Sequence, residues 1–374
     1  MAKKKILHIV GGEASVWVSG QLASQYHLWP EELFDQTIAA GEEPVARQVE
    51  NRVFRPVVRL GRRLKIEYTA ARNLSKLLRN NDPDLVLCWD IQATEQLKLA
   101  QRGSRKQVAA AVMLFNSGIN QEFLFKLKSN YRHLDLHVIC GSERLGRWAS
   151  QELSAQERVH CVYPVFEKPS ETIDKESLRR QMGFEPGTVL VFVPTEGKIN
   201  DNYLALLGCG INERVNPKIR IILAGNDEPR MEQCRNFALK TIVPRILHIA
   251  RDWDVHQVIG ACDLVIQPAG GYSETLALVE AMGRSVPVIS TAFAEPAELF
   301  RPNETFWNMG KVTGRAAGIG IYKMLGDEAL RQTLIANARE LVRQKCGGSE
   351  YRARLVKLYQ QILNPRMELE KSFL

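Results

Sequence analysis

Short apolar segments recur along the whole chain, and each is followed by a stretch with helical spacing. The first series of strand-like segments covers residues 5–10, 84–90, 108–115, 134–142 and 159–165. The second series covers residues 188–194, 219–225, 245–251, 262–269 and 286–291. Strands that alternate with helices are typical of parallel sheets with helices on both faces. The pattern therefore predicts an α/β protein built from two doubly wound, Rossmann-like halves.

A polar, charged and proline-bearing segment over residues 166–187 separates the two series and predicts a linker that leads into a helix. A chain of 374 residues is also too long for one ordinary core. We expect a first domain over 1–168, a second over 169–346, and a C-terminal helix or tail over 347–374 that packs back on the first. The default ligand site is a cleft between the two halves, lined by loops at the carboxyl ends of the strands.

The composition favours a soluble globular protein and excludes several classes. The chain is 45% apolar and 25% charged, and it has no apolar run near the length of a membrane span. The apolar run at the start is too short for a signal peptide, so we expect a cytoplasmic location. No His, Cys or Asp cluster has metal-ligand spacing, so we expect no metal. Gly11 and Gly12 form no GxGxxG motif, which disfavours nicotinamide chemistry.

The net charge of +8 is unevenly distributed. One segment, from Arg52 to Arg79, holds nine basic residues and a single acidic one, Glu67. Such a surface attracts phosphates or anionic lipid headgroups. We expect peripheral contact with an anionic membrane through Arg59, Arg62 and Arg63, and no nucleic-acid partner. The alternative is a solvated helix face that only keeps the protein soluble.

The stretch "GGYSETLALVEAMGRSVPVIS" over 270–290 predicts a glycine turn, a short helix and a buried strand. Ser273 is a suitable N-cap, and the first N–H groups of the helix would form an anion site. Those groups belong to Glu274, Thr275 and Leu276. Glu280 lies about two turns deeper, where a carboxylate needs a partner. It could accept hydrogen bonds from the hydroxyl groups of a sugar.

The segment "CDLVIQPAGGYSETLALVEAMGRSVPVIS" over 262–290 resembles the donor-site signature of retaining glycosyltransferases with the GT-B fold, of the family 4 (group 1) type. The matching positions are Pro268, Glu280, Ala281, Met282, Pro287 and Val288. The resemblance implies that Glu280 binds the ribose hydroxyls of the donor nucleotide. It also implies that the backbone amides of the loop, with Ser273, Thr275 and Leu276, bind the donor's phosphates and sugar.

The family carries a further glutamate eight residues before the one that Glu280 matches, and here that position is Tyr272. Either Tyr272 replaces that glutamate, or two residues are deleted and Glu274 takes its place. We favour Glu274 as the catalytic carboxylate. The family also places an arginine and then a lysine on the donor diphosphate. In "PTEGKIND" Lys198 matches the lysine, whereas Thr195 stands near the place of the arginine.

Three further segments resemble the family more weakly. The strand and glycine turn of "ILAGNDEPR" place Gly225 beside the nucleobase. The glycine loop in "HIVGGEA" places Gly12 toward the donor phosphates. The family often has a histidine after a strand of the first domain, and "VMLFNSG" offers Asn116 there. An asparagine can hydrogen-bond a hydroxyl but cannot transfer a proton.

These features predict a metal-independent glycosyltransferase of the hexosyltransferase type. It would move a sugar from a nucleotide-sugar donor to a glycan, a lipid-linked or another anionic acceptor, with retention implied by the resemblance. The nucleotide sugar is a substrate, so no cofactor is expected. The main alternative is a non-catalytic protein that binds a nucleotide or nucleotide sugar on the same fold. A weaker one is a nucleotide-sugar epimerase.

Overall fold

In the computed structural model the chain forms two compact units. The first unit comprises residues 1–115, 119–165 and 348–374, and the second comprises 116–118 and 166–347. The residues that the structure describes are 3–12, 16–41, 43–61, 67–102, 107–115, 121–166, 174–195, 199–224, 228–241, 246–250, 253–267, 276–292 and 298–363.

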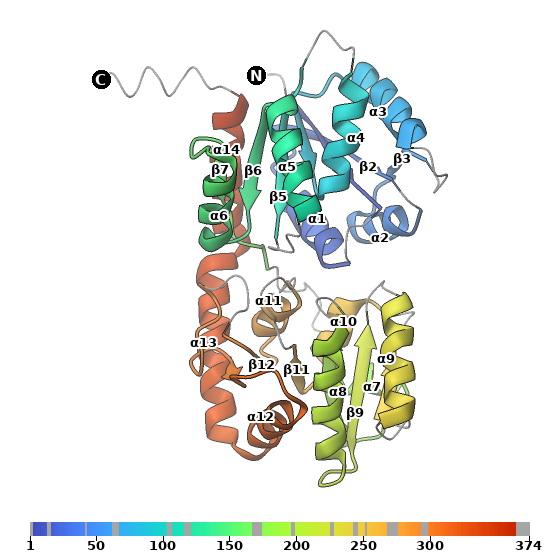
Figure 1. The fold of residues 1–374 in the computed structure, drawn as a ribbon, viewed down its shortest axis with the longest axis vertical. Coiled ribbons are helices and arrows are strands. Elements are labelled where there is room, and N and C mark those ends of the chain that lie inside the picture. Colours follow the sequence, from blue (N-terminus) through green and yellow to red (C-terminus); the bar gives the residue numbers. More distant parts are fainter. Residues whose placement is uncertain are drawn as a thin grey trace, which may run out of the picture. The chain divides into compact units, whose positions relative to one another are not determined.

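The first unit is built on one parallel sheet (Figure 1). Its strands are β1 (Lys4–Val10), β2 (Phe34–Ala40), β3 (Val58–Arg59), β4 (Leu85–Cys88), β5 (Ala109–Leu114), β6 (Leu136–Cys140) and β7 (Val159–Cys161). They lie in the order β3-β2-β1-β4-β5-β6-β7, and every pair in the described sheet is parallel. The chain leaves β1 toward β2 and β3 and then crosses back to β4. The gap between β1 and β4 is therefore the point where the winding reverses.

Helices cover both faces of this sheet. They are α1 (Val16–Leu28), α2 (Glu43–Val53), α3 (Glu67–Asn81), α4 (Ile91–Gln101), α5 (Gln121–Leu134), α6 (Glu143–Leu153) and α14 (Gly348–Leu363). The helices α3 to α6 share one buried apolar cluster with the strands, to which they contribute Leu74, Leu97, Leu127 and Leu145.

The last helix of the chain, α14, belongs to the first unit and packs against α1. Two buried tyrosines on α14 fix this contact through Gln25 of α1. The hydroxyl of Tyr351 donates to Gln25 Oε1 at 2.8 Å, and Gln25 Nε2 donates to the hydroxyl of Tyr359 at 3.0 Å. Buried polar groups that pair in this way fix the register of the two helices.

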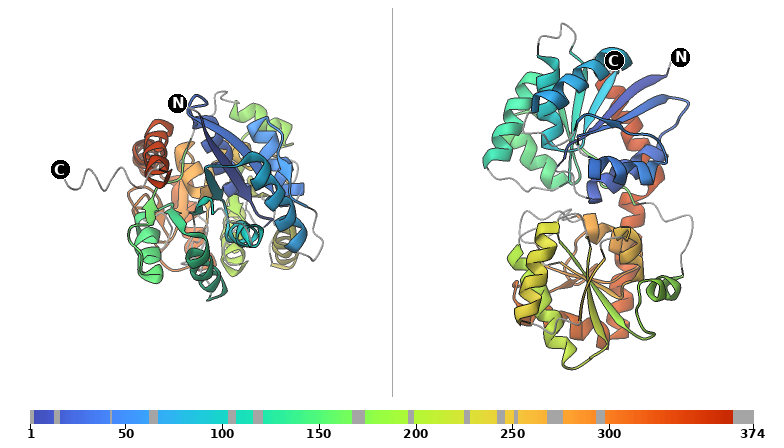
Figure 2. Two further views of the ribbon diagram at one scale, coloured as in Figure 1. Left: turned by 90° about the horizontal axis from the view of Figure 1, so that it is seen from above. Right: turned by 90° about the vertical axis from the view of Figure 1, so that its right-hand side faces the viewer.

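The second unit repeats the same architecture (Figure 2). Its strands are β8 (Val189–Pro194), β9 (Ile219–Ala224), β10 (Leu247–Ile249), β11 (Leu264–Ile266), β12 (Val288–Ser290) and β13 (Trp307–Asn308). They lie in the order β10-β9-β8-β11-β12-β13, and their described pairs are parallel. Its helices are α7 (Lys175–Gln181), α8 (Ile199–Glu213), α9 (Glu228–Thr241), α10 (Val255–Ala261), α11 (Leu276–Gly283), α12 (Gly314–Gly326) and α13 (Glu328–Cys346). Here the winding reverses between β8 and β11.

In the second unit, glycines allow α8 and α12 to pack closely against each other. A Cβ on Gly208 would lie 2.5 Å from Cβ of Ala317, closer than any real contact. Asn212, which is buried, donates to the carbonyl oxygens of Gly208 at 3.0 Å and Gly318 at 2.8 Å. The two helices therefore approach backbone to backbone, and one amide side chain joins them.

The predicted fold class is confirmed, since both halves are doubly wound parallel α/β sheets. Three strands were not predicted: β2, β3 and β13. β2 carries Asp35, Gln36 and Thr37 in its middle, so it lacks the continuous apolar run of a buried strand. The other two are only two residues long and give no periodic signal. In the described part of the chain, no helix has both the length and the apolar character that a bilayer crossing requires.

The close α8–α12 contact generates a stability prediction. Gly208→Ala should lower the free energy of unfolding by about 1–3 kcal/mol, because the new methyl group overlaps Ala317. Gly326→Ala is the matched control, since a Cβ at this last residue of α12 meets no atom within 4 Å. The control should be neutral or slightly stabilising. Urea unfolding of the three proteins measures both effects, and equal stability of the two variants would contradict the packing described.

Candidate functional site

The carboxyl ends of β8 and β11 lie side by side at the point where the winding of the second sheet reverses. In open α/β sheets, ligands bind in the crevice that forms at such a point. The helix that follows β11 is α11, and it is buried along its whole length except at its last residue, Gly283. Its sequence is apolar except for Glu280.

The carboxylate of Glu280 is buried and is held by two side chains of the same unit. Arg284, four residues further along, donates from Nε to Oε1 at 2.6 Å. His256, at the start of α10, places Nδ1 3.0 Å from the same oxygen. The protein therefore supplies the partners that a buried carboxylate requires.

His256 and Arg284 both contact the same carboxylate oxygen of Glu280, Oε1. Among the described residues, both partners of the carboxylate meet Oε1, and Oε2 has no hydrogen-bond partner. The side chain also keeps 11% of its surface exposed, so it is not sealed from solvent. The arrangement fixes the direction of the carboxylate and leaves one oxygen able to accept from a ligand.

The charge of Glu280 persists to low pH. Burial by itself raises the pKa of the carboxyl group, but His256 and Arg284 outweigh burial and lower the pKa from 4.5 to about 2. The group is therefore an acceptor at neutral pH and is unsuited to donating a proton. This behaviour fits the binding of hydroxyl groups rather than acid catalysis.

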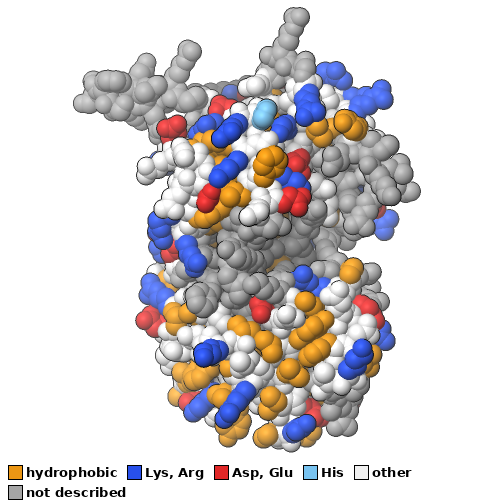
Figure 3. Space-filling model, in the orientation of Figure 1, with side chains coloured by type: hydrophobic (Ala, Val, Ile, Leu, Met, Phe, Trp, Pro, Cys, Tyr) orange, Lys and Arg blue, Asp and Glu red, His pale blue; other side chains and the backbone are white. Residues whose placement is uncertain are grey.

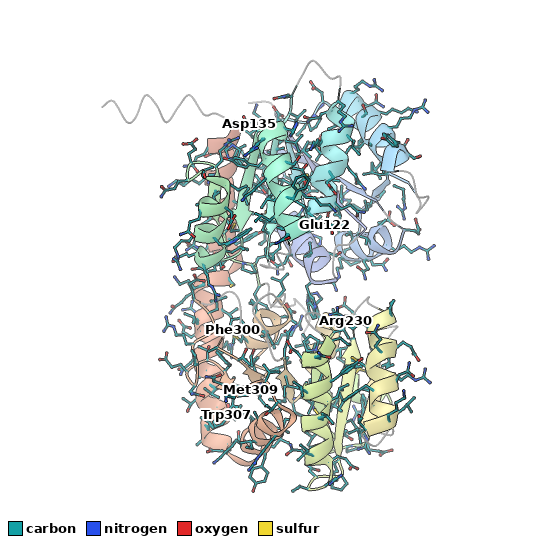
Figure 4. All side chains as sticks on the ribbon, in the orientation of Figure 1. Glu122, Asp135, Arg230, Phe300, Trp307 and Met309 are labelled. Carbon is teal, nitrogen blue, oxygen red and sulfur yellow. The ribbon has the colours of Figure 1, made fainter. Side chains whose placement is uncertain are left out.

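A second group of polar side chains lies at the carboxyl end of β8. Thr195 follows the strand and is buried, and its Oγ1 has no hydrogen-bond partner among the described residues. Asn202 of α8 is also buried. Its Nδ2 donates to the carbonyl oxygen of Pro194 at 2.6 Å, whereas its Oδ1 meets no partner in the described part of the chain. Arg230, which lies near the start of α9 (Figure 4), donates from Nη1 to the carbonyl oxygen of Thr195 at 3.0 Å.

The corresponding point of the first unit is occupied by its own side chains. The N–H of Gly11 donates to Asp90 Oδ2 at 2.8 Å, and the N–H of Gly12 donates to Gln92 Oε1 at 2.6 Å. Asp90 also caps α4 by accepting from the N–H of Ala93. A phosphate could use the amide of Gly12 only if Gln92 moved away.

Of the predicted donor-site residues, the structure describes Gly12, Leu276 and Glu280. Leu276 is the first residue of α11 and is buried. The remaining ones lie outside the described residues: Asn116, Lys198, Gly225, Ser273, Glu274 and Thr275.

The predicted membrane contact in the first unit is only partly described. Arg62 and Arg63 lie outside the described residues. Arg59 is paired with two carboxylates: its Nη2 donates to Glu50 Oε2 at 2.6 Å and its Nε lies 3.2 Å from Glu43 Oε2. The hydrogen bond from Arg59, followed by the one from the backbone N–H of Val57, lowers the pKa of Glu50 to about 2. The charge of Arg59 is therefore largely offset within the protein.

Three residues of the site were missed in the sequence: His256, Arg284 and Arg230. The spacing of Arg284, four residues after Glu280, is the standard spacing of a helical ion pair and could have indicated it. His256 and Arg230 come from separate helices that only the sheet topology brings to this end of the unit.

Comparisons with known proteins agree with this architecture. Residues 205–341 match the family model described as Glycosyl transferases group 1. The matched segment covers less than half of the chain and includes His256, Glu280 and Arg284. A comparison with curated proteins found no match.

Several solved structures share the fold at low sequence identity. Alr3699/HepE of Anabaena, in complex with UDP and glucose, has a TM-score of 0.75 at 16% identity, over 96% of this chain and 99% of that one. Sucrose-phosphate synthase of Thermosynechococcus elongatus has a TM-score of 0.71 at 14% identity, over 97% and 100%. A putative UDP-N-acetylglucosamine 2-epimerase of Listeria monocytogenes has a TM-score of 0.69 at 14% identity, over 96% of each chain. The architecture is thus the two-domain, GT-B-like one that was predicted.

The Glu280 ion pairs generate a prediction about stability and pH. Because the pKa is lowered in the folded state, the stabilisation is complete above about pH 4.5 and is lost as the pH falls toward 2. Glu280→Gln should therefore lower the free energy of unfolding at pH 7 by on the order of 2–3 kcal/mol. It should also flatten the dependence of stability on pH between 5 and 2. Urea unfolding over this pH range measures both effects.

Glu340→Gln is the matched control. The exposed carboxylate of Glu340 also has its pKa lowered to about 2, mainly by its hydrogen bond with Arg343. Solvent screens such a pair, so its loss should change stability little. If the two variants behave alike, the ion pairs of Glu280 do not contribute as described.

Proposed function

We propose that the protein is a glycosyltransferase that takes a sugar from a nucleotide-sugar donor bound to the second unit. The observation that carries the proposal is the carboxylate of Glu280, which is buried on the helix that follows β11, with Oε1 held by two side chains and no partner for Oε2 among the described residues. The match of residues 205–341 to the group 1 family model supports this assignment. So does the likeness to Alr3699/HepE, whose structures contain UDP and glucose or UDP-glucose.

In this proposal Glu280 accepts hydrogen bonds from the ribose hydroxyls. His256 and Arg284 keep the carboxylate charged and hold Oε1, so that Oε2 faces the ligand. Hydrogen bonds to a charged acceptor contribute about 1.5–3 kcal/mol each. The nucleoside is thereby positioned while the chemical step takes place at the sugar.

The leaving diphosphate must be stabilised as its charge develops. We assign this role to Lys198 and to the backbone amides that follow Ser273, which act electrostatically and without a metal ion. Glu274 would bind the transferred sugar, and Asn116 would hydrogen-bond one of its hydroxyls. The diphosphate itself would accept the acceptor's proton, and the configuration at the sugar would be retained. The acceptor we propose is a glycan or a lipid-linked or other anionic molecule bound to the first unit.

Two other functions have specific observations in their favour. A non-catalytic nucleotide-binding protein is favoured by Thr195 and Asn116, which stand where the family resemblance implies an arginine and a histidine. A nucleotide-sugar epimerase is favoured by the likeness to the putative epimerase of Listeria monocytogenes. Both would retain the nucleotide site at Glu280, so binding alone does not separate them from a transferase.

A ligand screen followed by turnover assays tests the proposal. UDP and UDP-sugars should raise the melting temperature of the wild type, because a ligand present at 100 times its Kd stabilises by about 2.7 kcal/mol. Release of the nucleoside diphosphate from the donor should fall at least about 100-fold in Glu280→Ala and in Lys198→Ala. Lys240→Ala, which changes an exposed lysine at the end of α9, is the control and should leave turnover unchanged.

Each rival function predicts a different result. Binding with neither donor hydrolysis nor sugar transfer would identify a binding protein. Conversion of one nucleotide sugar into another in the absence of an acceptor would identify an epimerase. Turnover that survives in both site variants would contradict the proposed site.

A further inference from the structure

The outer face of the α8–α12 helix pair exposes large apolar side chains. The exposed fractions are 50% for Ile211, 72% for Val215, 48% for Ile319 and 62% for Tyr322. Ile211 lies on α8 and Val215 just beyond its end, whereas Ile319 and Tyr322 lie one helical turn apart on α12. We refer to these four residues as the α8–α12 platform. Grouped apolar side chains on a protein surface mark interaction sites more often than isolated ones do.

The platform is one continuous and firmly supported surface. Ile211 reaches across to α12, since a Cβ on Gly318 would lie 3.6 Å from Cγ2 of Ile211. Val215 and Tyr322 line the same open hollow, which has a volume of about 500 Å³. The two helices are locked by the glycine contacts and by the two hydrogen bonds of Asn212. The apolar side chains therefore project from a rigid base rather than from a loop.

Basic side chains surround the platform, and the described residues provide no carboxylate that pairs with them. Arg214 and Lys218 lie beside it on the α8 side, and Arg315 and Lys323 lie on α12; all four are exposed. In the described part of the chain, none of these four cations takes part in an ion pair. Figure 3 shows basic and apolar side chains side by side on this face of the second unit. Arg59 in the first unit differs, because two carboxylates pair with it.

The acidic residues at the edge of the platform already have partners. Asp327 caps α13 by accepting from the N–H of Leu330 at 3.0 Å. Glu328 is paired with Arg331. The platform therefore presents apolar side chains together with cations that form no ion pair within the described residues.

We propose that the α8–α12 platform binds the surface of an anionic membrane. The apolar side chains would enter the boundary between headgroups and acyl chains, and the four cations would meet the lipid phosphates. Each Lys or Arg near an anionic bilayer contributes about 1 kcal/mol, and burial of an Ile or Val side chain contributes about 1.5–3 kcal/mol. Together these terms suffice for reversible binding that weakens with salt. Tyrosine is a common residue at the same depth of a bilayer.

The charges favour this partner over a second copy of the chain. In a two-fold dimer the same surface faces itself, so four unpaired cations would oppose four others. A nucleic acid would satisfy the cations but would offer little to two isoleucines and a valine. A membrane satisfies both kinds of side chain. The inference does not depend on the proposed catalytic function, because it needs neither donor nor acceptor.

Vesicle co-sedimentation of the full chain tests the proposal. The wild type should bind vesicles of equimolar phosphatidylcholine and phosphatidylglycerol, and should not bind pure phosphatidylcholine. The variant Ile319→Ser with Tyr322→Ser removes apolar side chains, and Arg315→Glu with Lys323→Glu reverses two charges. Each should weaken binding at least about 10-fold, and raising the salt from about 0.1 M to 0.5 M should also weaken it.

The control makes the same chemical changes on another helix. Leu239 is 50% exposed, and Lys240 beside it is also exposed on α9. The variant Leu239→Ser with Lys240→Glu should bind like the wild type. Circular dichroism of all variants confirms that these surface changes leave the fold intact.

Four results would overturn the proposal. The first is a failure of the wild type to bind anionic vesicles, or equal binding of the wild type to both kinds of vesicle. The second is binding of both platform variants to anionic vesicles as strongly as the wild type binds them. The third is a wild-type dimer in light scattering that the platform variants convert to a monomer, which would make this face an interface between copies. The fourth is an equal loss of binding in the α9 control.

Discussion

The buried charge of Glu280 is the constraint on which the account of the second unit depends. A carboxylate in an apolar helix destabilises a fold unless it is paired, and here His256 and Arg284 share one of its oxygens. The pairing does more than offset burial, because it lowers the pKa and fixes the direction of the group. Among the residues that the structure describes, Oε2 has no partner, an arrangement that suits the binding of a ligand.

Both units place polar groups at their reversal points but use them differently. In the first unit Asp90 and Gln92 accept from the amides of Gly11 and Gly12, so these loops are held together by the protein itself. In the second unit the hydroxyl of Thr195 and the amide oxygen of Asn202 are buried and have no partner among the residues that the structure describes. Unpaired buried polar atoms are costly and are expected where a ligand completes the hydrogen bonds. This contrast agrees with a nucleotide site in the second unit.

The sequence predicted the architecture well, because buried parallel strands are continuous apolar runs that alternate with helices. The sequence did not indicate β2, because the middle residues of this strand are polar. It did not indicate β3 or β13 either, because each is only two residues long. Glu280 could be identified because a charged residue interrupts an apolar helix. Its partner His256 could not, since contacts between distant helices leave no local pattern. The membrane contact expected of the basic segment around Arg59 stays a prediction, and the pairing of Arg59 with Glu43 and Glu50 could not be foreseen because it depends on the fold.

The most direct test of the central claim compares UDP with its 2′,3′-dideoxy analogue, in the wild type and in Glu280→Ala, by calorimetry. If the carboxylate binds the ribose, removal of the hydroxyls should weaken binding to the wild type by at least about 10-fold, as expected for hydrogen bonds to a charged acceptor. The same removal should have little effect on the variant, because the acceptor is already gone. An equal loss in both proteins, or no loss in the wild type, would show that Glu280 does not bind the nucleoside.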